Sequence, residues 1–272
     1  MNALLKLEFR KLKRQKWFYI SLAIMIAMLI ISAAATKLLP KAVSGTIPTD
    51  PEEQAAMGLT AEDVARMQAM LNREERGGFI ISAVANSFYT LLSAVFVAIV
   101  ACEDHEQQTL KNIFSRGYSR KSVYVSKAIC VFTACTVMFI VIHLAAALLA
   151  VLVLGMQKLD SGIFKNIAVV YLVCMAFNAL HLAVSSAIRK AGGSVAICIV
   201  GPMLLGTLLG VVQSMLKLQN FSISNYWIES FLGDASSLET SGKRLVEIAI
   251  ASGIYIALFT FLGELFGRKS EV

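Results

Sequence analysis

Charge is scarce in this sequence, and that scarcity excludes an ordinary soluble domain. Only 16% of the 272 residues are Asp, Glu, Lys or Arg, and 57% are hydrophobic, whereas an average soluble domain is about 25% charged. A soluble chain this apolar could not cover its surface with polar groups. The charges are also clustered, so long stretches of the chain carry none.

Motifs for nucleotide, metal or acyl chemistry are missing as well. The sequence has no Gly-x-x-x-x-Gly-Lys-Ser/Thr loop, and its nearest fragment, 241–244, lacks the first glycine and the hydroxyl. His105-Glu106 begins like a zinc-peptidase motif but has Thr109 where the second histidine would stand. A Gly-x-Ser-x-Gly nucleophile turn is absent. We therefore expect a chain without catalytic residues, without a metal site and without a cofactor of its own.

The cysteines form neither a disulfide framework nor a metal-binding pattern. All five lie in or at the ends of apolar stretches, and none lies in a long polar segment: Cys102, Cys130, Cys135, Cys174 and Cys198. We expect them to act as small apolar packing residues.

The long uncharged stretches predict an all-α membrane protein. A bilayer core about 30 Å thick is spanned by roughly 20 apolar residues in a helix that rises 1.5 Å per residue. Six stretches fit this description, with approximate bounds 17–36, 79–102, 128–154, 166–188, 192–216 and 245–267. The last stretch has Glu247 and Glu264 near its two ends, at the level of the lipid headgroups.

The distribution of charge predicts the orientation of the six spans. With the N-terminus inside, the cytoplasmic segments hold 15 Lys/Arg and five acidic residues, a net charge of +10, while the outer segments hold 10 Lys/Arg and 11 acidic residues. Cytoplasmic loops of membrane proteins are enriched in Lys and Arg in this way. We therefore expect both termini in the cytoplasm, and we assign the overall charge of +7 to topology rather than to nucleic-acid binding.

Three polar segments complete the domain organisation. Residues 1–16 place Leu5, Phe9 and Leu12 at helical spacing among cations, which favours an amphipathic helix in the inner lipid interface or a topology signal alone. The outer loop 37–76 is expected to be helical and to pack on the ends of spans or on a second copy, with a lid that contacts the substrate as the alternative. The aromatic-rich loop 217–244 suits a membrane-interface belt or a short re-entrant segment.

The segment 106–120 predicts a short amphipathic helix exposed to the cytoplasm. An acidic start suits the positive end of a helix dipole, and Leu110, Ile113 and Phe114 then fall on one face. Gly117 is a natural stop. An exposed apolar face of this kind can be inserted in a groove of a partner protein, or the segment can lie against its own bundle.

This segment resembles the loop between the second and third spans in permease subunits of type 2 ABC exporters. The matching positions are Thr109-Leu110-Lys111, Ser115-Arg116-Gly117, Ser119-Arg120 and Lys127. The sequence departs from the pattern at Gln108, where glycine is usual. The remaining topology, with a basic N-terminal helix, a long first outer loop and six spans, is similar to the same family.

The resemblance implies a coupling helix that sits in a groove of a separate ATP-binding subunit. ATP and magnesium would be bound by that subunit, and two ATPases with two permeases, a homodimer, would form the working unit. The resemblance extends to permeases that export antimicrobial and amphipathic peptides, including phenol-soluble modulins, across the plasma membrane of Gram-positive bacteria. The residues that it assigns to ATPase coupling are Glu106, Thr109, Leu110, Lys111, Ile113, Phe114, Arg116, Gly117, Ser119 and Arg120.

Polar and small residues within the spans are candidates for a pathway or for helix packing. Polar groups in a membrane are costly and usually face the bundle interior, and Gly206 with Gly210 forms a small-xxx-small pair just after Pro202. The candidates are Asn86, His143, Asn178, His181, Gly206, Gly210 and Gln213. Glu264 precedes Arg268 by one helical turn, which predicts an ion pair at the inner interface.

Two other classes of function remain open at this point. A proton-driven secondary transporter would use His143, His181, Glu247 and Glu264 and would need no ATPase. A membrane anchor or sensor would recruit a cytosolic protein through 106–120 without moving a substrate. Loss of the bound ATPase after polar substitution of the apolar face of 106–120 would distinguish the exporter from the secondary transporter.

Overall fold

The computed structural model describes residues 2–44, 76–155, 162–215 and 224–268, and all regular elements in these ranges are helical. The expectation of an all-α protein is thus confirmed. The elements are α1 (Asn2–Arg14), α2 (Lys16–Ser44), α5 (Arg76–Ile81), α6 (Ala83–Asn86), α7 (Tyr89–Glu106), α8 (Leu110–Phe114), α9 (Arg120–Leu154), α10 (Ile163–Ile188), α11 (Ala191–Met215), the short 3-10 turn η1 (Ser224–Tyr226), α12 (Ile228–Ala235) and α13 (Gly242–Arg268). The helices expected in the outer loop lie at 45–75, outside the described residues.

Five of these helices are long and apolar enough to cross a membrane. They contain the apolar segments Lys16–Thr36, Arg120–Val153, Ile163–Ile188, Ala191–Met215 and Gly242–Arg268. Each exceeds the roughly 20 residues that a bilayer core requires. The chain is therefore a multi-pass membrane protein, and these helices correspond to the first, third, fourth, fifth and sixth expected spans.

The second expected span, 79–102, is not one continuous helix, and the prediction was wrong in this respect. The segment is divided into α5, α6 and α7 by interruptions at Ser82 and at Ser87–Phe88. Both serine hydroxyls donate to backbone carbonyls three residues earlier (3.2 and 3.3 Å), and such bonds compete with the helical ladder. Phe88 adopts a left-handed conformation with φ of 53°, which ends the regular turn before α7.

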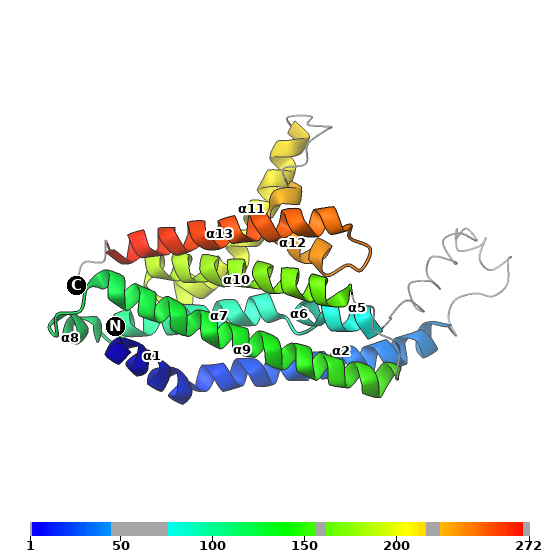
Figure 1. Cartoon of the computed structure of the whole chain (residues 1–272), viewed down its shortest axis with the longest axis horizontal. Coiled ribbons are helices and arrows are strands. Elements are labelled where there is room, and N and C mark those ends of the chain that lie inside the picture. Colours follow the sequence, from blue (N-terminus) through cyan, green and yellow to red (C-terminus); the bar gives the residue numbers. More distant parts are fainter. Residues whose placement is uncertain (1, 45–75, 156–161, 216–223, 269–272) are drawn as a thin grey trace.

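The long helices form a bundle with α10 at its centre. Figure 1 shows α2, α7, α9, α10 and α13 running side by side, and α10 packs on α7, α9, α11 and α13. The interrupted segment α5–α7 occupies the position of a full helix in this bundle, between α2, α9 and α10. The start of α1, the loop with α8 and the end of α13 lie at the same end of the bundle.

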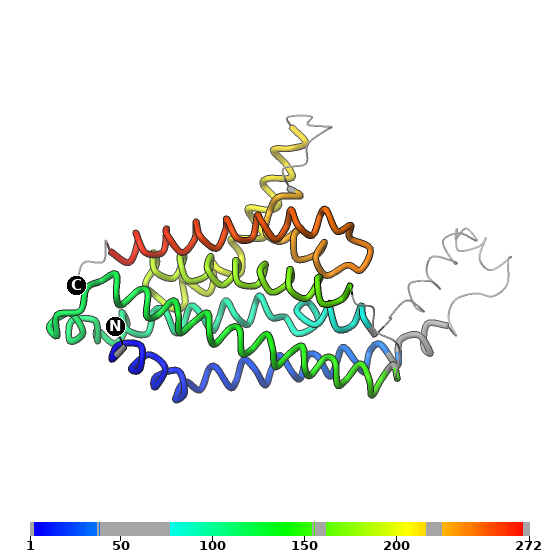
Figure 2. Tube along the Cα trace, viewed as in Figure 1, coloured from blue at the N-terminus to red at the C-terminus, as the bar shows by residue number. Residues whose placement is uncertain are grey.

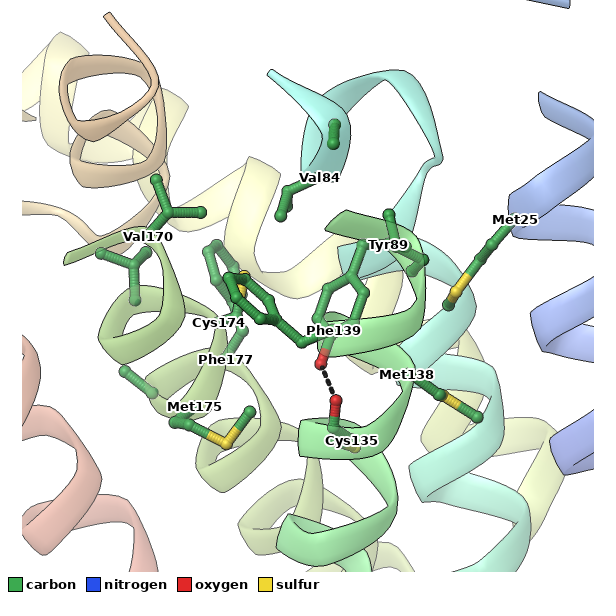
Figure 3. Packing of buried hydrophobic residues seen from close by; sticks show 14 of the residues in the cluster. Met25, Val84, Tyr89, Cys135, Met138, Phe139, Val170, Cys174, Met175 and Phe177 are labelled. Carbon is green, nitrogen blue, oxygen red and sulfur yellow. Dashed lines mark hydrogen bonds between the residues drawn. The ribbon is translucent and has the colours of Figure 1, made fainter. Parts of the chain in front are cut away.

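Buried aromatic and sulfur-containing side chains fill the middle of the bundle (Figure 3). Tyr89 is fully buried, donates a hydrogen bond from its hydroxyl to the carbonyl of Cys135 (3.0 Å), and meets the ring of Phe139 edge-on. The amide of Asn178 donates to the Tyr89 hydroxyl (3.3 Å). All five cysteines are buried and free, as expected of packing residues.

A glycine allows a close contact between α13, α10 and α9. A methyl group on Gly263 would lie 2.2 Å from the hydroxyl oxygen of Tyr124 and 3.1 Å from the Cα atom of Ala183. Both distances are shorter than ordinary van der Waals contact. The absence of a side chain at this position therefore lets α13 approach α10 backbone to backbone.

Helix α11 leaves the bundle in its second half. Figures 1 and 2 show it inclined to α10 and α13 and projecting beyond α13. Pro202 lies within the helix, where the missing N–H and the ring favour a bend. Beyond it, Met203, Leu208, Val212 and Met215 are all exposed. The second half of α11 is thus an apolar arm that the described part of the bundle leaves exposed.

The segment before α13 turns back into the bundle, which agrees with the re-entrant alternative. The indole of Trp227, immediately before α12, donates to the carbonyl of Pro202 (3.1 Å), about 17 Å along α11 from its start. At the other end of α12, the carbonyl of Ala235 accepts from the Asn166 amide (3.1 Å) near the start of α10. Helix α12 therefore leads from the middle of the bundle back to the end opposite α8.

Candidate functional site

The loop between α7 and α9 contains a much shorter helix than expected. Helix α8 covers only Leu110–Phe114, whereas Glu106 belongs to α7. Gly117 has φ of 83° and ends the turn after α8. Ser119 then caps α9, with its hydroxyl accepting from the backbone N–H of Ser122 (3.2 Å). The expected helix over 106–120 is thus wrong in length, because turns and a cap occupy both of its ends.

Gln108 occupies a backbone position that suits glycine. Its φ is 53°, in the left-handed region, and it is the position at which this sequence departs from the related motif. A residue with a Cβ atom loses roughly 1–2 kcal/mol in this conformation. The departure therefore leaves local strain in the turn that leads into α8.

Gln108→Gly is accordingly expected to stabilise the protein by about 0.5–1 kcal/mol, because the relief of strain exceeds the extra entropy of glycine in the unfolded chain. Thermal unfolding of the purified protein in detergent would measure this gain. Gln107→Gly is the matched control: its φ is −83°, so glycine should lower the unfolding midpoint there. Equal losses for both variants would show that backbone strain at Gln108 is not the cause.

The apolar face of α8 is covered by the chain itself. Leu110 and Ile113 are each 8% exposed and form a small cluster with Leu4 of α1 and Val123 of α9. Phe114 and Tyr118 pack partly against this cluster. Of the two alternatives that the sequence left open for this face, a partner groove or the chain's own bundle, the structure agrees with the second. Amphipathic spacing predicts that a face is covered but does not identify what covers it. The N-terminal helix covers it here.

Asp104, at the end of α7, joins four segments through one buried carboxylate. It is 2% exposed, and its two oxygens accept hydrogen bonds from Lys11 of α1 (2.5 Å), from Thr109 before α8 (2.8 Å) and from Lys127 of α9. Lys127 also donates to the carbonyl of Val100 (3.2 Å). We call Asp104, Lys11, Thr109 and Lys127 the Asp104 junction.

Electrostatics keep the Asp104 junction ionised. Burial alone would raise the pKa of Asp104, but the ammonium groups of Lys127 and Lys11 outweigh it and hold the pKa well below its ordinary value. Burial likewise opposes the charge on Lys11, yet its hydrogen bond to Asp104 raises the pKa above the ordinary value. Nearby, burial with the charges of Lys127 and Arg189 lowers the pKa of His105, which favours a neutral imidazole.

The opposite face of the loop is exposed and basic. Lys111, Asn112, Ser115 and Arg116 are exposed, and we call them the docking face. Beside it lies an open hollow of about 620 Å³, lined by Lys111, Phe114, Tyr118, Ser119 and Arg120. The Arg120 guanidinium lies 5.6 Å from the centre of the Phe114 ring. A partner that contacts this loop would therefore meet cations and aromatic edges.

The remaining residues assigned to coupling tie the loop to the ends of other helices. Glu106 accepts from the backbone N–H of Ala191 (2.8 Å), at the start of α11. Arg120 donates to the carbonyl of Arg268 (2.8 Å), the last residue of α13. Glu264 forms ion pairs with Arg268 and with Lys121 (3.5 Å). These contacts fix the end of the bundle that carries α8.

The polar candidates within the spans do not converge on one site. Asn86 donates to Ser82 (3.1 Å), His143 contacts the carbonyl of Phe139 (2.9 Å), and Asn178 belongs to the central core. His181 lines a cavity between α7, α10, α11 and α12.

The two glycines of the small-xxx-small pair in α11, Gly206 and Gly210, have different surroundings. Trp227 and Glu229 approach Gly206, whereas a Cβ atom on Gly210 would meet nothing within 4 Å among the described residues. Gln213 is half-buried. Among the described residues, the predicted close approach of another long helix at this pair is therefore not seen.

The acidic and histidine groups that a proton relay would use have separate partners in the fold. Glu247 pairs with Arg244 (3.5 Å) at the start of α13, while Glu264 lies near its other end. Among the described residues, no hydrogen bond links His143 or His181 to either glutamate. Within the described ranges, these four groups therefore do not form one hydrogen-bonded chain.

Sequence reasoning missed the role of Asp104, Lys11 and Glu8. Glu8 is 4% exposed and lies 3.6 Å from Lys11, so the buried face of α1 is partly polar, and Leu12 packs against the core beside these charged residues. A signal was available: Asp104 and Lys127 end and begin consecutive apolar runs, which places opposite charges at one membrane level. The resemblance to the exporter motif includes Lys127 but assigns no role to this residue.

Comparison with known proteins assigns the family. A family model described as ABC-2 family transporter protein matches residues 4–206, from α1 to the middle of α11. No curated protein matches the chain. The matched part includes the Asp104 junction, α8, three of the five long apolar helices in full and the first part of α11. The chain therefore belongs to the ABC-2 transporter family and is a membrane-embedded permease.

Proposed function

We propose that this chain is the permease subunit of an ATP-driven exporter and that a separate ATPase drives it through α8. The observation that carries the proposal is the way α8 is held: its apolar face is seated on α1 and α9, and the Asp104 junction links it to α7. A force applied to the docking face would therefore move three helices together. Family membership supports the general role of a permease with a partner ATPase.

The proposed topology has six crossings with both termini in the cytoplasm. The interrupted segment α5–α7 serves as the second crossing, since it lies within the bundle beside α2, α9 and α10. Its breaks are tolerable in a membrane because they lie among neighbouring helices. The basic segments at α1, in the loop around α8 and after α10 then share the cytoplasmic side, as the positive-inside pattern favours.

The proposed working unit contains two permeases and two ATPases, with ATP and magnesium on the ATPases. Closure of the ATPases would push both copies of α8 and rearrange the two bundles. The apolar arm of α11 is the surface available for the second permease copy, because the described residues leave its apolar side chains exposed. The proposed substrate is amphipathic, a peptide being the first choice, and it would leave from the cytoplasm or the inner leaflet.

Reversing the charge of the docking face tests the ATPase contact. Lys111→Glu with Arg116→Glu should weaken binding of the co-purifying ATPase at least about tenfold, because like charges would replace complementary ones at the interface. Affinity purification of the tagged chain from its native membranes, followed by mass spectrometry, measures the ATPase retained. The fold should survive, since both side chains are exposed.

Lys165→Glu with Lys243→Glu provides the control, because these exposed lysines begin α10 and α13 at the other end of the bundle. This control should retain the ATPase in full. The proposal fails if no ATP-binding subunit accompanies the wild-type chain, or if the docking-face variant retains it undiminished. Binding without any ATP-dependent transport would instead favour an anchor or sensor.

A further inference from the structure

A cavity of about 350 Å³ lies between α7, α10, α11 and α12, away from the loop that carries α8. It is lined by Phe88, Thr90, Leu91, Phe177, His181, Cys198, Ile199, Pro202, Met203, Glu229 and Leu232. We call it the lateral cavity. Its volume falls within the range of about 300–1,000 Å³ that is usual for small-ligand sites.

The lateral cavity is built at mid-depth in the bundle. His181 lies about 10 Å along α10 from the end that carries α8, and Leu91 about 22 Å along α7 from the same end. Phe88, Leu91 and Met203 are 52%, 41% and 61% exposed. These three side chains belong to the rim, so the cavity opens sideways between α7 and α11, towards lipid or a second copy.

Helix α12 supplies the one charged group of the cavity. Gly206 makes this possible, because a Cβ atom there would lie 3.0 Å from a carboxylate oxygen of Glu229 and 3.2 Å from the indole of Trp227. Among the described residues, no lysine, arginine or histidine forms an ion pair with Glu229. Its place in the first turn of α12 favours the ionised carboxylate, whereas burial raises the pKa of Glu229 above its ordinary value. The cavity is thus apolar, with one carboxyl group that has no cation beside it among the described residues.

A second polar group faces the same space. His181 is 1% exposed, and its Nδ1 atom has no hydrogen-bond partner among the described residues. A buried polar atom without a partner costs free energy unless a ligand or water satisfies it. Phe177, one turn away, places its ring 6.0 Å from the imidazole. Aromatic rings beside a carboxylate favour a cation over an anion.

We infer that the lateral cavity binds the cationic end of an amphipathic molecule, with a protonated amine or another organic cation at Glu229 and the apolar body against Phe88, Phe177 and Met203. The inference deepens the proposed export function, on which it rests for its role in transport, and specifies the substrate as a hydrophobic cation. The volume accommodates one such group or one basic residue with its apolar neighbours, not a whole peptide helix. Phe88 lies at the rim and has a left-handed backbone conformation. Its side chain would be displaced when the ligand enters the cavity.

A single tryptophan can report occupancy without any ATPase. The chain has two tryptophans, and Trp17→Phe leaves Trp227, which lies beside Glu229 at Gly206. The full-length variant in lipid nanodiscs would be titrated with tetraphenylphosphonium and with tetraphenylborate, ions of the same shape and opposite charge. We expect a saturable change in Trp227 emission with the cation, and no saturable change with the anion.

In the same background, Glu229→Gln should raise the apparent Kd for tetraphenylphosphonium about tenfold or more, because a neutral amide replaces the charge that holds the cation. Glu247→Gln, on the exposed side of α13, is the matched control and should leave the Kd unchanged. Thermal unfolding of the ligand-free variants establishes that each is folded. If Glu229→Gln is not folded, Gly206→Ala is the substitute variant. Its methyl group would displace Glu229 and should therefore weaken binding of tetraphenylphosphonium.

Three results would overturn the inference: saturation by both ions alike, a non-saturating response equal to that of protein-free nanodiscs, or an unchanged Kd in Glu229→Gln. The outcome is separate from that of the export proposal. Cation binding without a co-purifying ATPase would leave the cavity assigned and the export function refuted. A bound ATPase with no cation binding would do the reverse.

Discussion

Asp104→Asn is expected to destabilise the permease by about 3–5 kcal/mol, the usual loss when one partner of a buried ion pair is removed. The asparagine keeps the size of the side chain but leaves the ammonium of Lys127, which is 7% exposed, without a counter-ion. Lys11 would lose its carboxylate partner as well. Because Thr109 is held by the same carboxylate, the turn before α8 should open, and ATPase binding should fall with stability.

Chemical and thermal unfolding in detergent would measure the loss, and limited proteolysis within the loop would detect opening of the turn. Glu103→Gln is the control, since Glu103 is only partly buried and contacts Gln107 (3.3 Å). The double variant Asp104→Leu with Lys127→Met should be more stable than either single variant, because it removes both buried charges. If Asp104→Asn is as stable as the wild type, the Asp104 junction does not stabilise the protein as expected.

The contribution of the Asp104 junction should be constant around neutral pH. The pKa of Asp104 is lowered, so its contribution is complete above the ordinary carboxyl value of about 4 and is lost only as the pH falls towards the folded value. The pKa of Lys11 is raised, so its contribution is complete below the ordinary lysine value of about 10.4 and is lost above it. The loss in Asp104→Asn should therefore be the same at pH 6 and pH 8.

Gly263→Ala is expected to separate α13 from α10 and to destabilise the protein by about 1–3 kcal/mol, as overpacking of a tight interface does. The new methyl group would meet the Tyr124 hydroxyl at 2.2 Å and the backbone of Ala183 at 3.1 Å. The tyrosine ring can shift, since it borders a small cavity of about 50 Å³. The backbone of α10 cannot shift without moving the whole helix.

Gly253→Ala, in the same helix, is the matched control. A Cβ atom there meets nothing within 4 Å among the described residues, so alanine should stabilise α13 by up to about 1 kcal/mol through its higher helix propensity. Tyr124→Phe should partly rescue Gly263→Ala, because it removes the nearest atom and the Tyr124 hydroxyl has no hydrogen-bond partner among the described residues. Equal unfolding midpoints for the two alanine variants would contradict the close approach.

The sequence predicted the long helices well because their signal is local. A run of apolar residues of bilayer length fixes both the helix and its environment, and the five long helices arose from such runs. The interrupted second span was not predictable in this way. Its breaks depend on two serine hydroxyls bonding to nearby carbonyls and on a left-handed Phe88, which a hydropathy pattern does not record.

The candidate site shows the same division. The spacing of Leu110, Ile113 and Phe114 predicted an amphipathic turn correctly, but the choice between a partner protein and Leu4 of the same chain requires the tertiary structure. In the sequence, Asp104 is likewise only one of several acidic residues in this loop. Only the packing of α1 on α9 brings Lys11 and Lys127 to the same carboxylate, across a long separation in sequence.

The dependence of α8 on α1 and α9 has a consequence for biosynthesis. As the chain emerges from the ribosome, α1 is made first, and Leu110 and Ile113 follow only after two spans. Their cover on Val123 and the counter-ion Lys127 come with the third span. In the proposed mechanism, a nascent chain therefore cannot complete the contact between α8 and the ATPase until that span is inserted. The order of translation would thus disfavour binding of the ATPase to an incomplete permease.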